Sequence, residues 1–218
     1  MQPAPRSRSA PALKAVGPSH PQSPNAPQKR IRVARTLEDI MQVISMRAAV
    51  YMAEQSCPYA EEFDGNDFSG STHLVGSFDG EPAGCIRARF FADFAKLERL
   101  VVRAEFRRSS LAFDLVRAGI ELCRVKGYCR IYGHAQDRLV PFWKRFGARP
   151  IEPRRPLAFS DFSYTEMLLE TEPHPQALSL ASDPYVLIRP EGEWDRPGVL
   201  ERSTRRPVTS PLRNARAA

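Results

Sequence analysis

A basic turn near the middle of the chain joins a predicted strand to a long predicted helix. It reads Arg107-Arg108-Ser109-Ser110, and the helix that it opens extends to about Lys126. A helix N-terminus has unpaired N–H groups and the positive end of the helix dipole, which together favour bound phosphate. The arginines add charge, and the small serines let phosphate oxygens approach the backbone. The turn is therefore a candidate pyrophosphate site, although paired arginines before a helix also occur as solvated surface charge.

The turn lies within a succession of predicted strands and helices. Apolar residues at helical spacing predict helices over residues 36–55, 106–126 and 139–146. Strands are predicted over residues 31–34, 73–78, 82–91, 96–103, 128–134, 148–151 and 163–170. Thr36 and Asp39 form a capping box, Asp79-Gly80 indicates a tight hairpin, and Gly127 and Gly147 are placed to end helices. The pattern predicts an α/β (α+β) domain with about six to seven strands flanked by helices.

The composition divides the chain into a central domain and two extensions. Of its 218 residues, 42% are hydrophobic and 26% charged, which permits a packed core over residues 30–170. Residues 1–29 are rich in Pro, Ser, Ala and Gln and are predicted to be disordered. Residues 171–218 are Pro-rich and predicted to be mostly disordered, with one apolar island at Tyr185-Val186-Leu187-Ile188. We expect this island to dock on the domain or on a partner.

The formal net charge of +7 belongs to the two ends of the chain. Residues 1–37 hold seven Lys or Arg and no acid, and residues 201–218 hold five Arg and one Glu. The stretch between them therefore carries about −4, so the domain itself is not basic. We expect no nucleic-acid partner, because solvated tails explain the basic charge.

The cysteines and the hydropathy pattern indicate a cytoplasmic location. The four cysteines stand singly with no CxxC pair, which predicts neither a disulfide framework nor a metal site. No apolar run approaches 18 residues, so we expect no membrane span. The N-terminus lacks the apolar segment of a signal peptide.

Two segments resemble signatures of the GNAT acetyltransferase superfamily over roughly residues 31–169. Residues 100–112 resemble the family's "LAV-x-P-E-Y-R-G-x-G-I-G", whose core is (Q/R)-x-x-G-x-(G/A). Arg107 matches the first core position and Ala112 the last, and Ser110 replaces the central glycine. Residues 142–148 resemble the closing "l-Y-e-k-l-G-F", with Trp143 at the tyrosine. Gln136, seven residues earlier, falls where the family often has Asn.

The resemblance implies a mixed central sheet that splays between the fourth and fifth strands. An acyl-pantetheine arm would lie in that gap like an extra strand, with acetyl-CoA or another acyl-CoA as the acyl donor and no metal. The residues implied to bind this donor are Leu100, Val101, Val102, Arg107, Arg108, Ser109, Ser110, Leu111, Ala112, Gln136 and Trp143.

Acylation of an amine also needs a group that takes a proton. Glu98 is the candidate base, and by strand alternation it shares a face with Lys96, Leu100 and Val102. The alternative is a surface glutamate paired with Lys96. The family often has a tyrosine that protonates the leaving thiolate. An indole cannot act as that acid, so Tyr132 or His134 could substitute, unless His134 is only a solvent-facing residue.

The first half of the domain is similar to a narrower branch, the acyl-homoserine lactone and N-acyl amino acid synthases. The matching residues are Arg47, Tyr51, Asp64, Asp67, Arg87 and Arg99. Their charges could form a network that orders a long substrate loop. A structural role would suffice to explain them.

These features predict an N-acyltransferase that transfers an acetyl or acyl group to a primary amine of a small molecule. One alternative is an N-acyl amino acid synthase-like enzyme with a long-chain donor on CoA or on an acyl carrier protein. Another is a non-catalytic module that binds CoA or a partner. The sequence leaves open whether the protein forms a homodimer.

Overall fold

The computed structural model describes residues 27–207, which divide into two compact units at about residue 180. Residues 1–26 of the predicted disordered tail lie outside the described part of the chain. The elements of the first unit are β1 (Lys29–Val33), α1 (Leu37–Arg47), α2 (Tyr59–Glu62), β2 (Ser71–Phe78), β3 (Glu81–Phe90), β4 (Ala95–Val102), α3 (Leu111–Val125), β5 (Arg130–Gln136), α4 (Val140–Lys144), β6 (Arg149–Pro150), β7 (Leu157–Phe159) and β8 (Phe162–Glu170).

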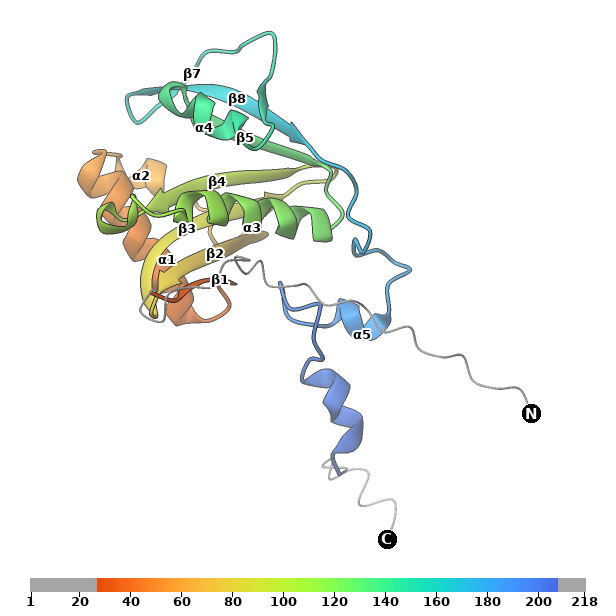
Figure 1. The fold of residues 1–218 in the computed structure, drawn as a ribbon. Helices are drawn as coiled ribbons and strands as arrows, with labels where there is room; N and C mark the ends of the chain where they lie inside the picture. The colour runs from red at the N-terminus through yellow and green to blue at the C-terminus, as the bar shows by residue number, and fades with distance from the viewer. Residues whose placement is uncertain (1–26, 208–218) are drawn as a thin grey trace. The chain divides into compact units, whose positions relative to one another are not determined.

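The strands form one mixed, eight-stranded sheet. Its order is β1-β2-β3-β4-β5-β8-β6, with β7 also paired to β8 (Figure 1). The pairing of β4 with β5 is parallel and the other pairings are antiparallel. The predicted α/β class is confirmed, with the short strand β7 added to the six or seven that were expected.

Helices α1 and α3 cover opposite faces of β3. Cys85 packs in a cluster with Val43 and Met46 of α1. The next residue, Ile86, lies against Gly119 of α3, where an added Cβ would be 3.8 Å from Ile86 Cδ1. Alternate residues of a strand point to opposite faces. The sheet is therefore buried on both sides at β3.

A bulge at Arg99 breaks the alternation that was expected along β4. Arg99 has φ 55°, and the register with β3 shifts between Cys85 and Arg87. Val101 consequently packs in the cluster beneath α1, and Val102 lies on the α3 side near Leu115. The prediction that Glu98 shares its face with Leu100 and Val102 is wrong, because an extra residue in one strand reverses the faces beyond it.

The capping and turn predictions are confirmed. Thr36 Oγ1 accepts from the Asp39 N–H at 3.1 Å, and Asp39 Oδ2 accepts from the Thr36 N–H at 3.1 Å. Asp79 and Gly80 form the hairpin turn with φ of 49° and 87°. The predicted first helix changes at residue 48 into a π-helical segment, Ala48–Glu54, and α2 follows in the expected loop. Helix α3 begins at Leu111, after a short 3₁₀ turn at Ala104–Phe106.

The second unit contains the apolar island of the C-terminal extension. Residues of the island form the one-turn helix α5 (Pro184–Leu187), and a 3₁₀ helix spans Leu200–Arg205. Arg189 Nη2 pairs with Glu201 Oε1 at 2.7 Å, and Trp194 is buried at 7% exposure. The proposed limits of the extension, and its docking on the domain, stay predictions. In the described residues, no helix is long and apolar enough to cross a membrane.

Candidate functional site

The candidate site is centred where β4 and β5 part. These strands pair only through Ala95 with Ile131 and Lys96 with Tyr132. Beyond that point β4 stays paired with β3 as far as Val102, and β5 stays paired with β8. The two halves of the sheet therefore diverge, as Figure 1 shows. The predicted splay between the fourth and fifth strands is confirmed.

An apolar pocket lies at this divergence, between the sheet and helices α3 and α4. Leu97, Ile120, Trp143 and Phe146 contribute side chains to its lining, together with residues of β5 and β8. Its free volume is about 20 Å³, which is room for roughly one water molecule. An added Cβ at Gly133 would lie 3.0 Å from the Leu97 carbonyl oxygen. Trp143 lines this pocket, and its role in binding the acyl donor stays a prediction.

Three side chains of β5 and β8 form a hydrogen-bonded chain beside this pocket. Tyr132 Oη lies 2.6 Å from His134 Nε2 and 2.6 Å from Glu166 Oε1. Glu166 is the cross-strand partner of His134. Phe94 packs on the Tyr132 ring and Phe159 on the His134 ring, with centroid distances of 6.0 and 5.9 Å. The structure brings both predicted proton-transfer residues together and adds Glu166.

The surroundings set the protonation states of this chain. Burial raises the pKa of Tyr132, and its hydrogen bond to Glu166 raises that pKa further. Burial lowers the pKa of His134, the charge of Lys96 lowers it further, and Glu166 and Glu98 oppose both effects. At neutral pH the phenol therefore keeps its proton and the imidazole is neutral. A neutral imidazole can accept a proton.

Glu98, the predicted base, is held by basic side chains. Its Oε1 lies 2.7 Å from Arg87 Nη2, and its Oε2 lies 2.7 Å from Lys96 Nζ. Burial raises the pKa of Glu98, but Arg87 and Lys96 outweigh burial and leave that pKa lowered. A carboxylate with a low pKa and both oxygens engaged is a weak proton acceptor. The geometry favours the alternative that the sequence left open, in which Glu98 pairs with Lys96.

The residues matched to the synthase branch meet in one network around two arginines. The side chains of Arg47 and Arg87 are both fully buried. Arg47 Nε lies 2.5 Å from Glu62 Oε1, and Arg47 also pairs with Asp67. Arg87 lies 2.8 Å from Asp67 and 2.6 Å from Asp64. These contacts fasten α2 and the loop after it to α1 and β3.

Arg99 and Tyr51 extend the network to β4. Arg99 Nη1 lies 3.1 Å from Glu62 Oε2, and Arg99 Nη2 lies 3.1 Å from Asp64 Oδ2. The Arg99 guanidinium lies 5.7 Å from the centroid of the Tyr51 ring. Tyr51 Oη donates to the Leu100 carbonyl at 3.1 Å. The network therefore fixes the bulged part of β4, beside which the donor was expected.

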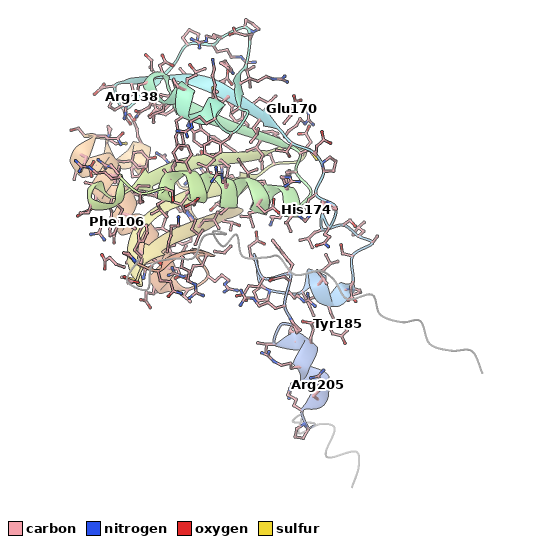
Figure 2. All side chains as sticks on the ribbon, in the orientation of Figure 1. Phe106, Arg138, Glu170, His174, Tyr185 and Arg205 are labelled. Carbon is pink, nitrogen blue, oxygen red and sulfur yellow. The ribbon has the colours of Figure 1, made fainter. Side chains whose placement is uncertain are left out.

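The arginine that matches the family signature already has protein partners. Arg107 Nε donates to the Val102 carbonyl at 2.9 Å, and its Nη2 pairs with Glu54. Figure 2 shows Phe106 at the start of this turn. Arg108 is exposed. The turn is electropositive even without the charge of Arg107, because Arg108 is exposed and the N-terminus of α3 is the positive end of the helix dipole.

The serines of the turn shape its backbone. Ser109 Oγ accepts from the Leu111 N–H at 3.2 Å, whereas the Ala112 N–H lies in the first helical turn without an intrahelical partner. Ser110 has φ −76°, so serine fits where the signature has glycine. Its Oγ lies 2.8 Å from Asp114 Oδ2 and 2.7 Å from Lys29 Nζ. Both serine hydroxyls are therefore engaged within the protein, and the binding of phosphate at this turn stays a prediction.

Gln136, at the end of β5, contacts the residue that follows the π-helical segment and a residue of the neighbouring strand β8. Its Nε2 lies 3.2 Å from Gln55 Oε1 and 3.3 Å from Tyr164 Oη. Nearby, Ser160 at the β7–β8 turn donates to Glu61 through its backbone N–H at 2.8 Å. Gln136, which the resemblance implied to bind the acyl donor, is therefore hydrogen-bonded to other side chains of the domain.

The matching family model supplies the class to which this fold and site belong. The model of the acetyltransferase (GNAT) family matches residues 39–148, which run from α1 past α4 and include the divergence of β4 and β5. The chain therefore belongs to the acetyltransferase (GNAT) family, and the class of activity that follows is N-acyl transfer.

Individual relatives agree with this assignment. YjcF of Bacillus subtilis, an uncharacterized N-acetyltransferase, is 29% identical over 123 residues, 56% of this chain and 86% of that protein. The crystal structure of Escherichia coli ElaA is 21% identical with a TM-score of 0.59, covering 66% of this chain and 100% of that one. FeeM, an N-acyl amino acid synthase from uncultured soil microbes, is 11% identical with a TM-score of 0.58, over 66% and 91%. At these identities the two structural likenesses are of fold.

Two carboxylates of the site were not singled out from the sequence. Glu62 stands in the acidic run Glu61-Glu62, and nothing in that run tells which side chain is buried. Glu166 lies on the predicted last strand, but its partner Tyr132 is 34 residues away, and only the pairing of β5 with β8 joins them. The only signal in the sequence was the alternation of side chains along the last strand, which indicates the face on which Glu166 lies.

Proposed function

We propose that this chain transfers an acyl group from acyl-CoA to a primary amine of a small molecule, with His134 as the base. The observation that carries the proposal is the meeting of an apolar pocket and a neutral imidazole where β4 and β5 part. The thioester supplies an activated acyl carbonyl. The chain must hold that carbonyl near the amine and remove the amine's proton.

The residues around the gap fit an acyl-CoA donor. Among the described residues, 27–207, no strand pairs with Leu100, Val101 and Val102 on the β5 side of β4, which suits an extended pantetheine arm. Unpaired amides and the exposed Arg108 at the start of α3 suit pyrophosphate. Trp143 takes the place of a thiolate-protonating tyrosine, and His134 can return the proton that it has accepted.

The pocket favours a short acyl group. A free volume of about 20 Å³, which is room for roughly one water molecule, is far below the space that a long alkyl chain needs. We therefore favour acetyl-CoA, or a similarly short acyl-CoA, over the long-chain donor of an N-acyl amino acid synthase-like enzyme and over a carrier-protein donor.

Release of free thiol from acetyl-CoA in the presence of a panel of primary amines tests the proposal. We expect amine-dependent release by the wild type, and a loss of about 10²- to 10⁴-fold in kcat for His134→Ala. The matched control is His174→Ala, because His174 pairs with Glu121 of α3 away from the gap (Figure 2). Thiol release that needs neither an amine nor His134 would contradict the proposal. Bound but unreactive acetyl-CoA would favour the non-catalytic module.

A further inference from the structure

We propose that Glu166, acting through Tyr132, holds the proton of the His134 imidazole on Nε2 and leaves Nδ1 as the atom that accepts a proton from the amine. This inference rests on the proposed function, because it assigns the atom that serves as base. It also makes Glu166 and Tyr132 positioning residues, which do not themselves touch the reacting atoms.

The direction of the hydrogen bonds follows from the number of protons. The hydroxyl of Tyr132 has one proton to donate and lies 2.6 Å from both of its neighbours. An ionised carboxylate only accepts hydrogen bonds. Glu166 forms an ion pair with Arg155, whose Nε lies 3.9 Å from Glu166 Oε2. Tyr132 must then donate to Glu166, and the remaining contact requires an N–H on His134 Nε2.

The other ring nitrogen is left for the substrate. Within the part of the chain that the structure describes, His134 Nδ1 has no hydrogen-bond partner. The charged groups that face the ring are Lys96 and Glu98 of β4 and Glu166 of β8. The β7 residue against it is Phe159, which carries no charge. The ring is therefore oriented by one nitrogen and open at the other.

The transfer step balances with His134 alone as proton carrier. A bond forms between the amine nitrogen and the acyl carbon, and the carbon–sulfur bond breaks with its electron pair on sulfur. Nδ1 of His134 takes the proton that the nitrogen loses, and His134 then gives this proton to the sulfur. The products are an amide and a free thiol, and Glu166 takes no part in the proton transfer.

The tautomer can be measured without any substrate. Long-range ¹H–¹⁵N correlation spectra of the free, full-length protein report which ring nitrogen carries the proton, and His134→Asn identifies the signals of His134. We expect the Nε2–H form in the wild type and a mixture of tautomers in Tyr132→Phe. A wild-type proton on Nδ1 would overturn the inference, whether or not the protein acylates amines.

Kinetics supply a second, independent readout. Tyr132→Phe should lower kcat about tenfold with an unchanged KM for the acyl donor, because only the orientation of the base is lost.

Activity should rise with pH through the His134 pKa. Glu166→Gln removes a charge that raises this pKa and should move the rise to lower pH, while Lys96→Met should move it to higher pH.

The matched control is Glu170→Gln on the same strand. Glu170 ends β8 and is exposed (Figure 2), and its cross-strand partner is Arg130 rather than His134, so its variant should keep the wild-type kcat and pH profile. Wild-type profiles for Glu166→Gln and Lys96→Met as well would overturn the inference. If those variants still acylate amines, the proposed function stands.

Discussion

The two fully buried arginines, Arg47 and Arg87, set the energetics of the site at the scale of single residues. A buried charge is costly unless it is paired and hydrogen-bonded. Each guanidinium here meets at least two carboxylates, and Asp67 is shared between them. The network therefore keeps α2 and its loop in one position beside β4.

Removing one carboxylate from this network should destabilise the whole domain. Glu62→Ala leaves Arg47 without its 2.5 Å partner, and we expect the free energy of unfolding to fall by about 3–5 kcal/mol. Urea denaturation measures the change. Glu38→Ala, at an exposed position of α1, is the control and should change stability by less than about 0.5 kcal/mol. A loss of that small size for Glu62→Ala would contradict the account.

Asp39 makes part of the stability depend on pH. Burial raises its pKa, but hydrogen bonds from the Arg35 and Thr36 backbone and from Arg32 outweigh burial and lower the pKa from 3.8 to about 2. A carboxyl group with a lowered folded-state pKa stabilises the fold above its unfolded pKa, and this stability is lost as pH falls through the folded pKa.

The wild-type melting temperature should therefore drop between about pH 4 and pH 2. Asp39→Asn should be less stable than the wild type at pH 7 and should lose less over that interval. Thermal melts followed by circular dichroism at several pH values give both quantities. Parallel pH dependences for the two proteins would show that Asp39 does not contribute.

At the scale of elements, the pocket depends on how α4 closes the gap between β5 and α3. Trp143 and Phe146 lie on its wall, and Phe142 and Phe146 pack on Phe113 of α3 with ring centroids 5.0 and 5.6 Å apart. This aromatic contact fixes the width of the pocket. If the acyl group enters this pocket, as we propose, side chains of α4 rather than the sheet limit its length.

Trp143→Ala should widen the pocket and shift the preference toward longer acyl groups. We expect the ratio of kcat/KM for octanoyl-CoA over acetyl-CoA to rise by about tenfold, which is within the effect of a few methylene groups in an apolar pocket. Trp194→Ala, in the second unit, should leave the ratio unchanged. An unaltered ratio in Trp143→Ala would place the acyl group elsewhere.

The order of the elements was predictable because each had a local signal. The capping box at Thr36, the Asp79-Gly80 turn and the glycine at residue 127, with φ 93°, are encoded by a few neighbouring residues. The turn before β8 was missed, since Ser160 and Asp161 adopt φ of 48° and 61° there without a glycine. The bulge at Arg99 was missed for the same reason.

The candidate site was predictable where a motif is contiguous or where the chain resembles a known family. The basic turn and Trp143 were found in this way, and the charged set was found by resemblance. The chain of Tyr132, His134 and Glu166 needs the pairing of β5 with β8, which alternation alone does not specify. Choosing Glu98 as the base likewise overlooked Arg87, its partner across the sheet at 2.7 Å.

At the scale of the whole molecule, the acyltransferase machinery lies within one of the two units. All of the residues assigned to the site fall between residues 47 and 169 of the unit that ends at Ser179. The second unit has its own buried Trp194 and the ion pair of Arg189 with Glu201. We therefore propose that binding of the acyl donor and proton transfer both take place in the first unit.

Calorimetric titration with acetyl-CoA, using the wild type and the double variant Arg107→Ala/Arg108→Ala, tests whether the acyl donor binds where β4 and β5 part. The account predicts one site per chain in the wild type and binding at least about tenfold weaker in the variant, because a charge-assisted contact to phosphate is lost. Arg117→Ala, an exposed arginine farther along α3, should bind like the wild type. No binding to the wild type at high ligand concentration, or equal affinity in the double variant, would contradict a donor site where β4 and β5 part.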